Sequence, residues 1–189
     1  MDCPEKLRFY KPLAKITKQA EDLILNGNPI ITRKYDGEMM VIKVDNGEVQ
    51  IFSRTMLPTH HLEDTPWAVR FPQLVKAFSK VRGSHIFTGE VVSSCKTGAK
   101  DERWLVAAVL KSKTPKALAE QVEHGTLDYI IWDWPVKDGQ KNTDTYGERI
   151  TSIYALTNPQ GDLGQQTCVA PPAVYHNGKS SGLKPKSVE

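Results

Sequence analysis

The chain has 189 residues, of which 39% are hydrophobic and 25% charged, with a mean hydropathy of −0.43. This length suits one domain with a substantial core, and the composition excludes an intrinsically disordered protein. No apolar run reaches the roughly 20 residues that a transmembrane helix needs, and the N-terminal residues lack the apolar segment of a secretory signal. We therefore expect a cytoplasmic protein without a membrane partner. The net charge of +3 is only a weak indication of a nucleic-acid or phosphate ligand.

The cysteines indicate the redox environment. Cys3, Cys95 and Cys168 are scattered, odd in number and without a Cys-x-x-Cys pair. Such spacing is not that of a zinc site or a disulfide framework. We expect three free thiols in a reducing compartment.

The first third of the chain reads as a helix followed by strands. Residues 17–25 carry apolar side chains at helical spacing and end at an Asn-Gly pair. Three β-rich runs follow at 28–35, 38–45 and 48–55, separated by Asp-Gly and Asp-Asn-Gly. These turn residues predict an antiparallel meander. Lys34 would lie at the end of its first strand.

Helices and strands alternate in the next part of the chain. We predict helices at 71–80, 114–125 and 146–156, and strands at 85–92 and 127–136. In the second helix Thr114 would be the N-cap and Pro115 the first helical residue. No repeat and no linker interrupts this series. The predicted fold class is therefore α+β, with antiparallel sheets flanked by helices.

The composition changes after Asn158. Residues 159–189 are rich in Gly, Pro, Ser and Gln, which predicts loops or a poorly packed segment. We accordingly expect one main domain over residues 1–158 and a separate C-terminal segment over residues 159–189.

Four short motifs carry the chemistry. Lys34-Tyr35-Asp36-Gly37 taken alone reads as a surface lysine before a common hairpin turn. It is followed in order by Ser53-Arg54, by Gly89-Glu90 and by Trp132-Asp133, each at the end of a predicted strand or near it. This ordered set resembles the covalent nucleotidyltransferases, and most closely the ATP-dependent DNA ligases. The resemblance covers roughly residues 9–153.

The resemblance implies a ligase-type nucleotidyltransferase (ATP-grasp-like) domain and gives Lys34 a role. In that family the lysine of the Lys-x-Asp-Gly motif attacks ATP, with Mg²⁺, and becomes adenylated. Attack needs a neutral amine, whereas a free lysine is mostly protonated near neutral pH, so such a site must favour the neutral form. The AMP is then passed to a 5′-phosphate of nicked double-stranded DNA, and sealing releases AMP.

The resemblance also assigns other nucleotide-binding residues. Glu90 would contact the ribose or hold the divalent metal, and Trp132 would stack on the purine. Arg33, beside the lysine, and Arg54 would contact the nucleotide or, for Arg54, the 5′-phosphate of the nick, as suits a guanidinium. The alternatives are a solvated carboxylate for Glu90, core packing for Trp132 and a surface ion pair for Arg54. Asp36 would shape the turn.

The sequence departs from the family pattern in several places. No Glu-Gly pair, the expected main metal contact, occurs between Arg149 and Tyr175. Lys184 and Lys186 match the expected Lys-x-Lys motif, but a proline separates them. Met39 stands where the family usually has a basic residue, and we expect no C-terminal OB-fold domain in this chain. The expectation is a minimal, truncated or internally deleted adenylation domain.

These departures leave alternative functions open. The enzymatic alternative is an RNA ligase or a capping-type nucleotidyltransferase, and the other is a catalytically dead nucleotide-binding remnant. For a ligase, we expect a monomer that is cytoplasmic, phage-encoded or nucleoid-associated. Its self-adenylylation would be slow or undetectable, and this chain alone would not seal a nick at physiological ionic strength. Sealing would require another carboxylate at the metal site, such as Asp133 or Glu148.

Overall fold

The computed structural model describes residue 18 and residues 30–93, 103–164, 168–172, 174–176 and 179–180. The chain forms two compact units, one made of Met1–Arg33 with Ala173–Glu189 and the other of Lys34–Pro172. The predicted domain boundary at residue 158 falls inside the second unit and stays a prediction.

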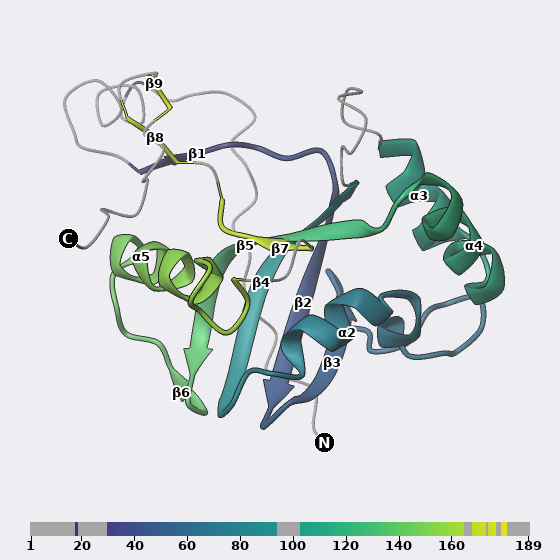
Figure 1. Ribbon diagram of the computed structural model, residues 1–189, viewed down its shortest axis with the longest axis horizontal. Helices are drawn as coiled ribbons and strands as arrows, with labels where there is room; N and C mark the ends of the chain where they lie inside the picture. The colour runs from purple at the N-terminus through teal and green to yellow at the C-terminus, as the bar shows by residue number, and fades with distance from the viewer. Residues whose placement is uncertain are drawn as a thin grey trace. The chain divides into compact units, whose positions relative to one another are not determined.

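A twisted sheet forms the centre of the larger unit (Figure 1). Its strands are β2 (Glu38–Asp45), β3 (Glu48–Ser53), β4 (Ser84–Ser93), β5 (Leu127–Lys137) and β6 (Gln140–Lys141). They are all antiparallel in the order β3-β2-β4-β5-β6. The predicted strands at 38–45, 48–55, 85–92 and 127–136 are confirmed, and so is the α+β class.

The β2–β3 hairpin forms as its turn residues predict. Asn46 and Gly47 both have positive φ angles, 50° and 90°, and Asp45 pairs with Glu48 across the turn. Two consecutive left-handed residues are the mark of a type I′ turn, which matches the right-handed twist of the strands that it joins. The prediction of a hairpin at Asp-Asn-Gly is confirmed.

The prediction for residues 28–35 is wrong. Of the described residues in this run, only Ile31–Thr32 form a strand, β1, and it pairs with β8 (Val174–His176) rather than with β2. Lys34 lies two residues beyond the strand. The Asp36-Gly37 pair makes a bend, and Gly37 is not among the described glycines with positive φ, so no hairpin turn forms here.

The C-terminal part contains more structure than its composition suggests. Val169–Ala170 form β7, which pairs in parallel with β5 in the larger unit. In the smaller unit β8 pairs with β9 (Lys179–Ser180), so β1, β8 and β9 make a three-stranded antiparallel sheet. The expectation of loops alone after residue 158 is therefore wrong for these residues.

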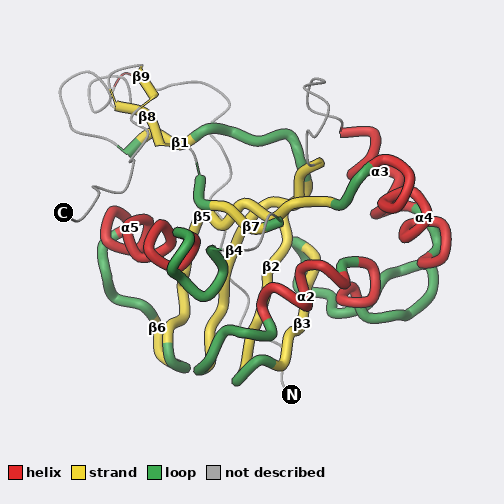
Figure 2. Tube along the Cα trace, viewed as in Figure 1, coloured by secondary structure: helices red, strands yellow, loops and turns green. Residues whose placement is uncertain are grey.

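Helices accompany the main sheet. They are η1 (Trp67–Arg70), α2 (Pro72–Phe78), α3 (Arg103–Lys111), α4 (Thr114–His124) and α5 (Tyr146–Thr157). Figure 2 shows α2 and α5 in front of the strands, with α3 and α4 at one side. The predicted helices at 71–80, 114–125 and 146–156 are confirmed. The run that forms α3 was not predicted as a helix, and the predicted helix at 17–25 lies outside the described residues except for Lys18, which is helical.

Two helix starts show how side chains set the ends. Thr145 caps α5 in a complete capping box with Glu148, in which each side chain bonds the backbone of the other. Helix α4 instead begins at Thr114, with Lys113 as its N-cap. The prediction of Thr114 as N-cap is wrong because its hydroxyl and its backbone N–H both donate to Glu63.

The core lies between the sheet and α2. The ring of Phe78 packs against Phe87 and Tyr129, with centroids 5.3 and 6.0 Å apart. Tyr129 is fully buried, and its hydroxyl donates to the carbonyl oxygen of Met40 at 3.0 Å, with the Phe87 carbonyl at 3.3 Å. Burial raises the pKa of Tyr129 well above its ordinary value. None of the described helices is long and apolar enough to cross a membrane.

A buried arginine joins η1 to the two helices α3 and α4. Arg70 has no solvent exposure, and it donates to the carbonyl oxygens of Val109 at 3.0 Å and Ser112 at 2.5 Å. Its guanidinium also pairs with Glu63 at 2.8 Å, and Glu63 accepts both bonds from Thr114. The end of α3 and the start of α4 are thus held by one charge pair. Truncating one partner of such a pair leaves an uncompensated buried charge.

We predict that Arg70→Met lowers the free energy of unfolding by about 3 kcal/mol, because Glu63 and two carbonyl groups lose their partner. Urea denaturation measures this change. The matched control is Arg82→Met, since Arg82 is exposed and makes one long bond to the Asn46 carbonyl. The control should change stability by less than about 0.5 kcal/mol. Equal losses in the two variants would contradict the role of Arg70.

Candidate functional site

The Lys-x-Asp-Gly segment is joined directly to the Gly-Glu motif. The backbone N–H of Gly37 donates to Oε1 of Glu90 at 2.7 Å. Glu90 lies in β4, opposite Met39 of β2. Two motifs 53 residues apart in sequence therefore meet through one hydrogen bond at the start of β2.

Gly37 packs too closely against β4 to carry a side chain. A Cβ atom here would overlap the carbonyl oxygen of Val91 and would lie 2.9 Å from Cγ of Glu90. The glycine of the motif is therefore explained by close approach and not by a left-handed turn. The interpretation of Asp36-Gly37 as hairpin turn chemistry is wrong for this reason.

Glu90 is a half-buried carboxyl group. Burial raises its pKa above the ordinary glutamate value, while the bond from the Gly37 N–H and the charge of Lys34 act in the opposite direction. The nearby carboxylates of Glu38 and Asp36 raise it further. Glu90 is thus not a fully solvated carboxylate, because its environment disfavours the ionised form.

Trp132 lies on the same face of the sheet as Glu90. Its indole N–H donates to the hydroxyl of Thr88 at 3.0 Å, and Thr88 is two residues before Glu90 in β4. Side chains two apart in a strand share a face. Trp132 is half-buried rather than buried in the core. This face also carries Met39, the cross-strand partner of Glu90.

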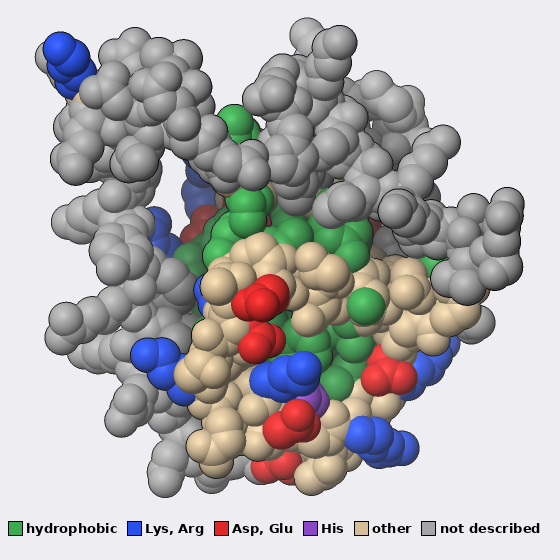
Figure 3. Space-filling model, turned by 90° about the vertical axis from the view of Figure 1, so that its left-hand side faces the viewer, with side chains coloured by type: hydrophobic (Ala, Val, Ile, Leu, Met, Phe, Trp, Pro, Cys, Tyr) green, Lys and Arg blue, Asp and Glu red, His purple; other side chains and the backbone are tan. Residues whose placement is uncertain are grey.

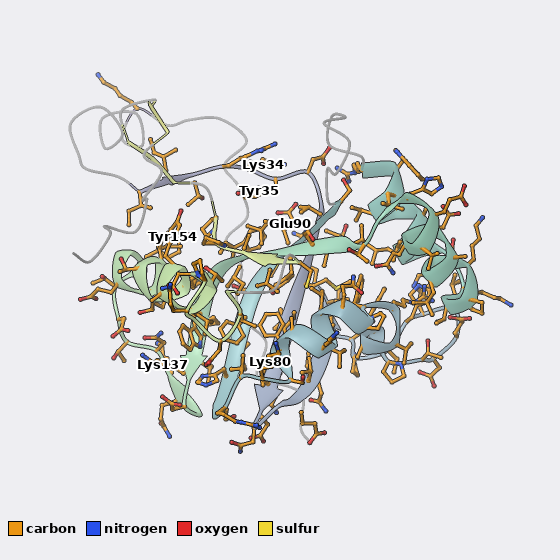
Figure 4. All side chains as sticks on the ribbon, in the orientation of Figure 1. Lys34, Tyr35, Lys80, Glu90, Lys137 and Tyr154 are labelled. Carbon is orange, nitrogen blue, oxygen red and sulfur yellow. The ribbon has the colours of Figure 1, made fainter. Side chains whose placement is uncertain are left out.

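Lys34 is exposed and is close enough to Glu90 to influence its ionisation. Figure 4 labels both residues, which come from the segment before β2 and from β4. Two residues after Lys34, Asp36 forms an ion pair with Arg103 at the start of α3. Arg103 was not singled out in the sequence. No local signal could have identified it, since the two residues are 67 positions apart.

The remaining four predicted site residues are Arg33, Arg54, Lys184 and Lys186. Arg54 is exposed and directly follows β3, one position beyond the Met40–Ser53 pair. Arg33 is exposed and belongs to the smaller unit. Lys184 and Lys186 lie outside the described residues. The structure thus brings Lys34, Glu90 and Trp132 to the β2–β4–β5 region, and the roles of all seven predicted residues stay predictions.

Two further carboxylates have structural partners. Asp133 accepts from Nε of Arg149 at 2.6 Å and from the Trp134 backbone at 2.8 Å. Glu148 is used in the capping box of α5, and hydrogen bonds from Thr145 lower its pKa. A metal ion would have to displace these partners. Neither carboxylate is therefore a ready replacement for the glutamate of the absent Glu-Gly motif.

The donor set around Glu90 limits how a metal could bind. The described residues contain no group of three or more His, Cys, Asp or Glu side chains that could hold a metal ion. Mg²⁺ commonly binds through one or two carboxylates, with the remaining positions filled by phosphates and water. Glu90, whose Oε1 already accepts from Gly37, fits such a site as a single ligand beside a bound nucleotide.

A separate hollow of about 250 Å³ lies on the other face of the sheet. It is lined by Glu38 and Met40, whose side chains alternate with that of Met39 along β2. Helix α3 forms its opposite wall. The hollow is therefore distinct from the face that carries Glu90 and Trp132.

On one side of the molecule (Figure 3), the surface charge of the described residues is mixed. Figure 3 shows one side of the molecule, on which acidic and basic side chains are interspersed rather than separated by sign. Because the net charge is only +3, we expect few non-specific contacts with the phosphates of a nucleic acid.

Comparison with known proteins places these observations in a family. The family model "ATP dependent DNA ligase domain" matches residues 11–165. A search of curated proteins gave no significant match. The fold is similar to that of a mycobacterial DNA ligase D, solved in complex with ATP and MES, and to that of the ligase domain of LigD from M. tuberculosis.

Both structural matches have a TM-score of 0.51 and a sequence identity of 16%, and they cover 79% of this chain. They cover only 41% of the solved chains, so this chain spans about two fifths of their length. The likeness at this identity concerns the fold. The family match covers most of the chain and includes Lys34, Glu90 and Trp132. The chain therefore belongs to the ATP-dependent DNA ligase domain family.

Proposed function

We propose that this chain is the adenylation domain of an ATP-dependent DNA ligase, and that Lys34 is the residue that becomes adenylated. One observation carries the proposal: the segment with Lys34 is joined through Gly37 to Glu90, on the sheet face that also holds Trp132. A surface lysine before an ordinary hairpin would need none of these contacts. The family match over residues 11–165 supports the same reading.

The proposed first step is a nucleotidyl transfer, in which AMP passes from ATP to the amine of Lys34. The neutral amine of Lys34 attacks the α-phosphorus of ATP, the bond to the β-phosphate oxygen breaks, and pyrophosphate leaves. The amine loses a proton to solvent, and a lysyl-AMP phosphoramidate results. An oxygen of a DNA 5′-phosphate then attacks the same phosphorus and displaces Lys34, and the 3′-hydroxyl finally displaces AMP to seal the nick.

The other residues would bind and orient the nucleotide. Trp132 presents a half-buried indole ring that suits stacking on the purine. Glu90 suits a ribose hydroxyl or Mg²⁺, which would supply charge neutralisation at the phosphates when bound. Arg54, exposed at the end of β3, suits a phosphate.

A second candidate function is nucleotide binding without transfer. The observation that favours it is the short connection between α5, which ends at Thr157, and β7, which begins at Val169. The segment between them contains no Glu-Gly pair. Asp133 and Glu148, the two carboxylates considered as replacements for the absent glutamate, are held by Arg149 and Thr145. Such a protein would bind ATP and gain no covalent AMP.

The first test asks whether AMP becomes covalently attached to Lys34. Incubation with ATP and Mg²⁺ should add the mass of one AMP to the intact chain, and Lys34→Ala should abolish the addition, because the attacking amine is gone. Lys34→Arg should be equally inactive, since a guanidinium stays protonated. The matched control is Lys80→Ala, an exposed lysine after α2, which should react like the parent chain. Adenylylation of folded Lys34→Ala would refute the assignment, and no addition to the parent chain would favour nucleotide binding without transfer.

A second prediction concerns Trp132. Replacement by Ala should weaken ATP binding about tenfold, corresponding to roughly 1.4 kcal/mol, whereas Phe should retain most of the affinity because it keeps an aromatic face. Calorimetric titration measures the ATP affinity of both variants. Trp104→Ala is the control, since Trp104 is 49% exposed on α3. Equal ATP affinities for folded Trp132→Ala and Trp132→Phe would mean that the ring packs rather than stacks.

A third prediction uses the raised pKa of Glu90. Gln at this position keeps an oxygen that accepts from Gly37 and removes the charge that burial disfavours. A raised folded pKa stabilises the protein at low pH, and this contribution is lost as pH rises through that pKa. The stability of Glu90→Gln relative to the parent chain should therefore increase from about pH 4 to about pH 8. Urea midpoints at several pH values measure the difference.

Glu148→Gln provides a control of opposite sign. The pKa of Glu148 is lowered by its bonds with Thr145, so its carboxylate stabilises the fold above its unfolded pKa and this contribution is lost in acid. The Gln variant should therefore become less stable than the parent chain as pH rises. A pH-independent difference for Glu90→Gln would show that burial does not penalise its charge.

A further inference from the structure

The hollow on the α3 side of the sheet has an apolar interior. Met40, Trp67 and Val106 line it and are 1%, 7% and 3% exposed, and Leu110 adds a further apolar wall. Small-molecule sites are typically concave, mostly apolar and supplied with a few polar groups. The volume of about 250 Å³ is that of a site for one small ligand.

The rim of the hollow is mainly basic. Arg103 and Lys111, at the two ends of α3, line it together with His61, and all three side chains are exposed. Glu38 is the one acidic residue in the lining, and Ser53 adds a hydroxyl group. The guanidinium of Arg103 pairs with Asp36 through one nitrogen and has further N–H donors.

Trp67 closes the inner wall of the hollow. Its side chain is more than nine-tenths buried, and its indole nitrogen is inaccessible to solvent. A ligand in the hollow therefore meets apolar surface of Trp67 rather than its N–H donor.

We propose that this hollow is a second binding site, for a small aromatic anion such as an aryl phosphate or aryl carboxylate. The aromatic ring would lie against Ala107 and Leu110 of α3, and the anionic group would face Arg103 and Lys111. Met40, Trp67 and Val106 would form the floor beneath the ring. The hollow opens on the opposite face of the sheet from Glu90, although Gly37, whose N–H donates to Glu90, also lines it. The proposal does not rest on the proposed ligase activity. Arg103 connects it to the segment of Lys34 through Asp36.

Phenyl phosphate is a suitable probe, because it combines one ring with one anionic group. Calorimetric titration of the full chain should show saturable binding to one site, and saturating ATP should leave the affinity unchanged. Inorganic phosphate should bind at least about tenfold more weakly, since it lacks the ring that the apolar lining would bury.

Two variants locate the site. Ala107→Phe fills the hollow from α3, and Arg103→Ala removes a rim cation. Each should weaken phenyl phosphate binding by about tenfold or more. Lys116→Ala is the control, because Lys116 is an exposed lysine of α4 outside the lining, and it should bind like the parent chain. Arg103 is exposed, so its replacement tests the site even where Ala107→Phe fails to fold.

The proposal would be overturned by the absence of saturable phenyl phosphate binding, by unchanged affinity in folded Arg103→Ala, or by displacement of the probe by ATP. The last result would place the probe on the face of Glu90 instead. Equal affinities for phenyl phosphate and inorganic phosphate would likewise exclude an aromatic ligand.

Discussion

Gly37 donates its N–H to Glu90 at a point where the chain leaves no space for a side chain. This close approach fixes where β2 begins relative to β4, and with it the cross-strand pair of Met39 and Glu90. Any larger residue would have to push β2 away from the Val91 carbonyl. The position of the Lys34 segment beside Glu90 therefore depends on a backbone contact, which is stiffer than a contact between two flexible side chains.

The alternation of β2 then separates two kinds of surface. Met39 faces the same side as Glu90, while Glu38 and Met40 line the hollow under α3. Because a strand alternates with a period of two, a shift of one residue in its register would exchange these faces. The β2–β3 hairpin resists such a shift, since its left-handed Asn46 and Gly47 fix the turn. The turn thus helps to fix the register that places Met39 on the same face as Glu90, at the other end of β2.

What the sequence could predict follows from the range of each interaction. The hairpin at Asn46 and helix α5, which Thr145 caps, depend on neighbours within a few residues. Both were therefore predictable from the sequence. The pairing of β1 with β8 and the bond between Asp36 and Arg103 join distant segments, so no local pattern indicates them. Helix α3 was missed because a short apolar run is compatible with either a helix or a strand.

The environment of Glu90 is unusual for a binding carboxylate. Its cross-strand neighbours are Met39 and Ile130, so the carboxylate loses hydration without gaining a fixed cation from β2 or β5. The Gly37 N–H and the charge of Lys34 offset this loss only in part, because the pKa remains raised. A ligand that brings a hydroxyl donor or positive charge to Glu90 would favour the ionised form, and its binding would be linked to release of a proton from the protonated fraction. The cost of burying the Glu90 carboxylate thus favours ligands that can donate a hydrogen bond to it.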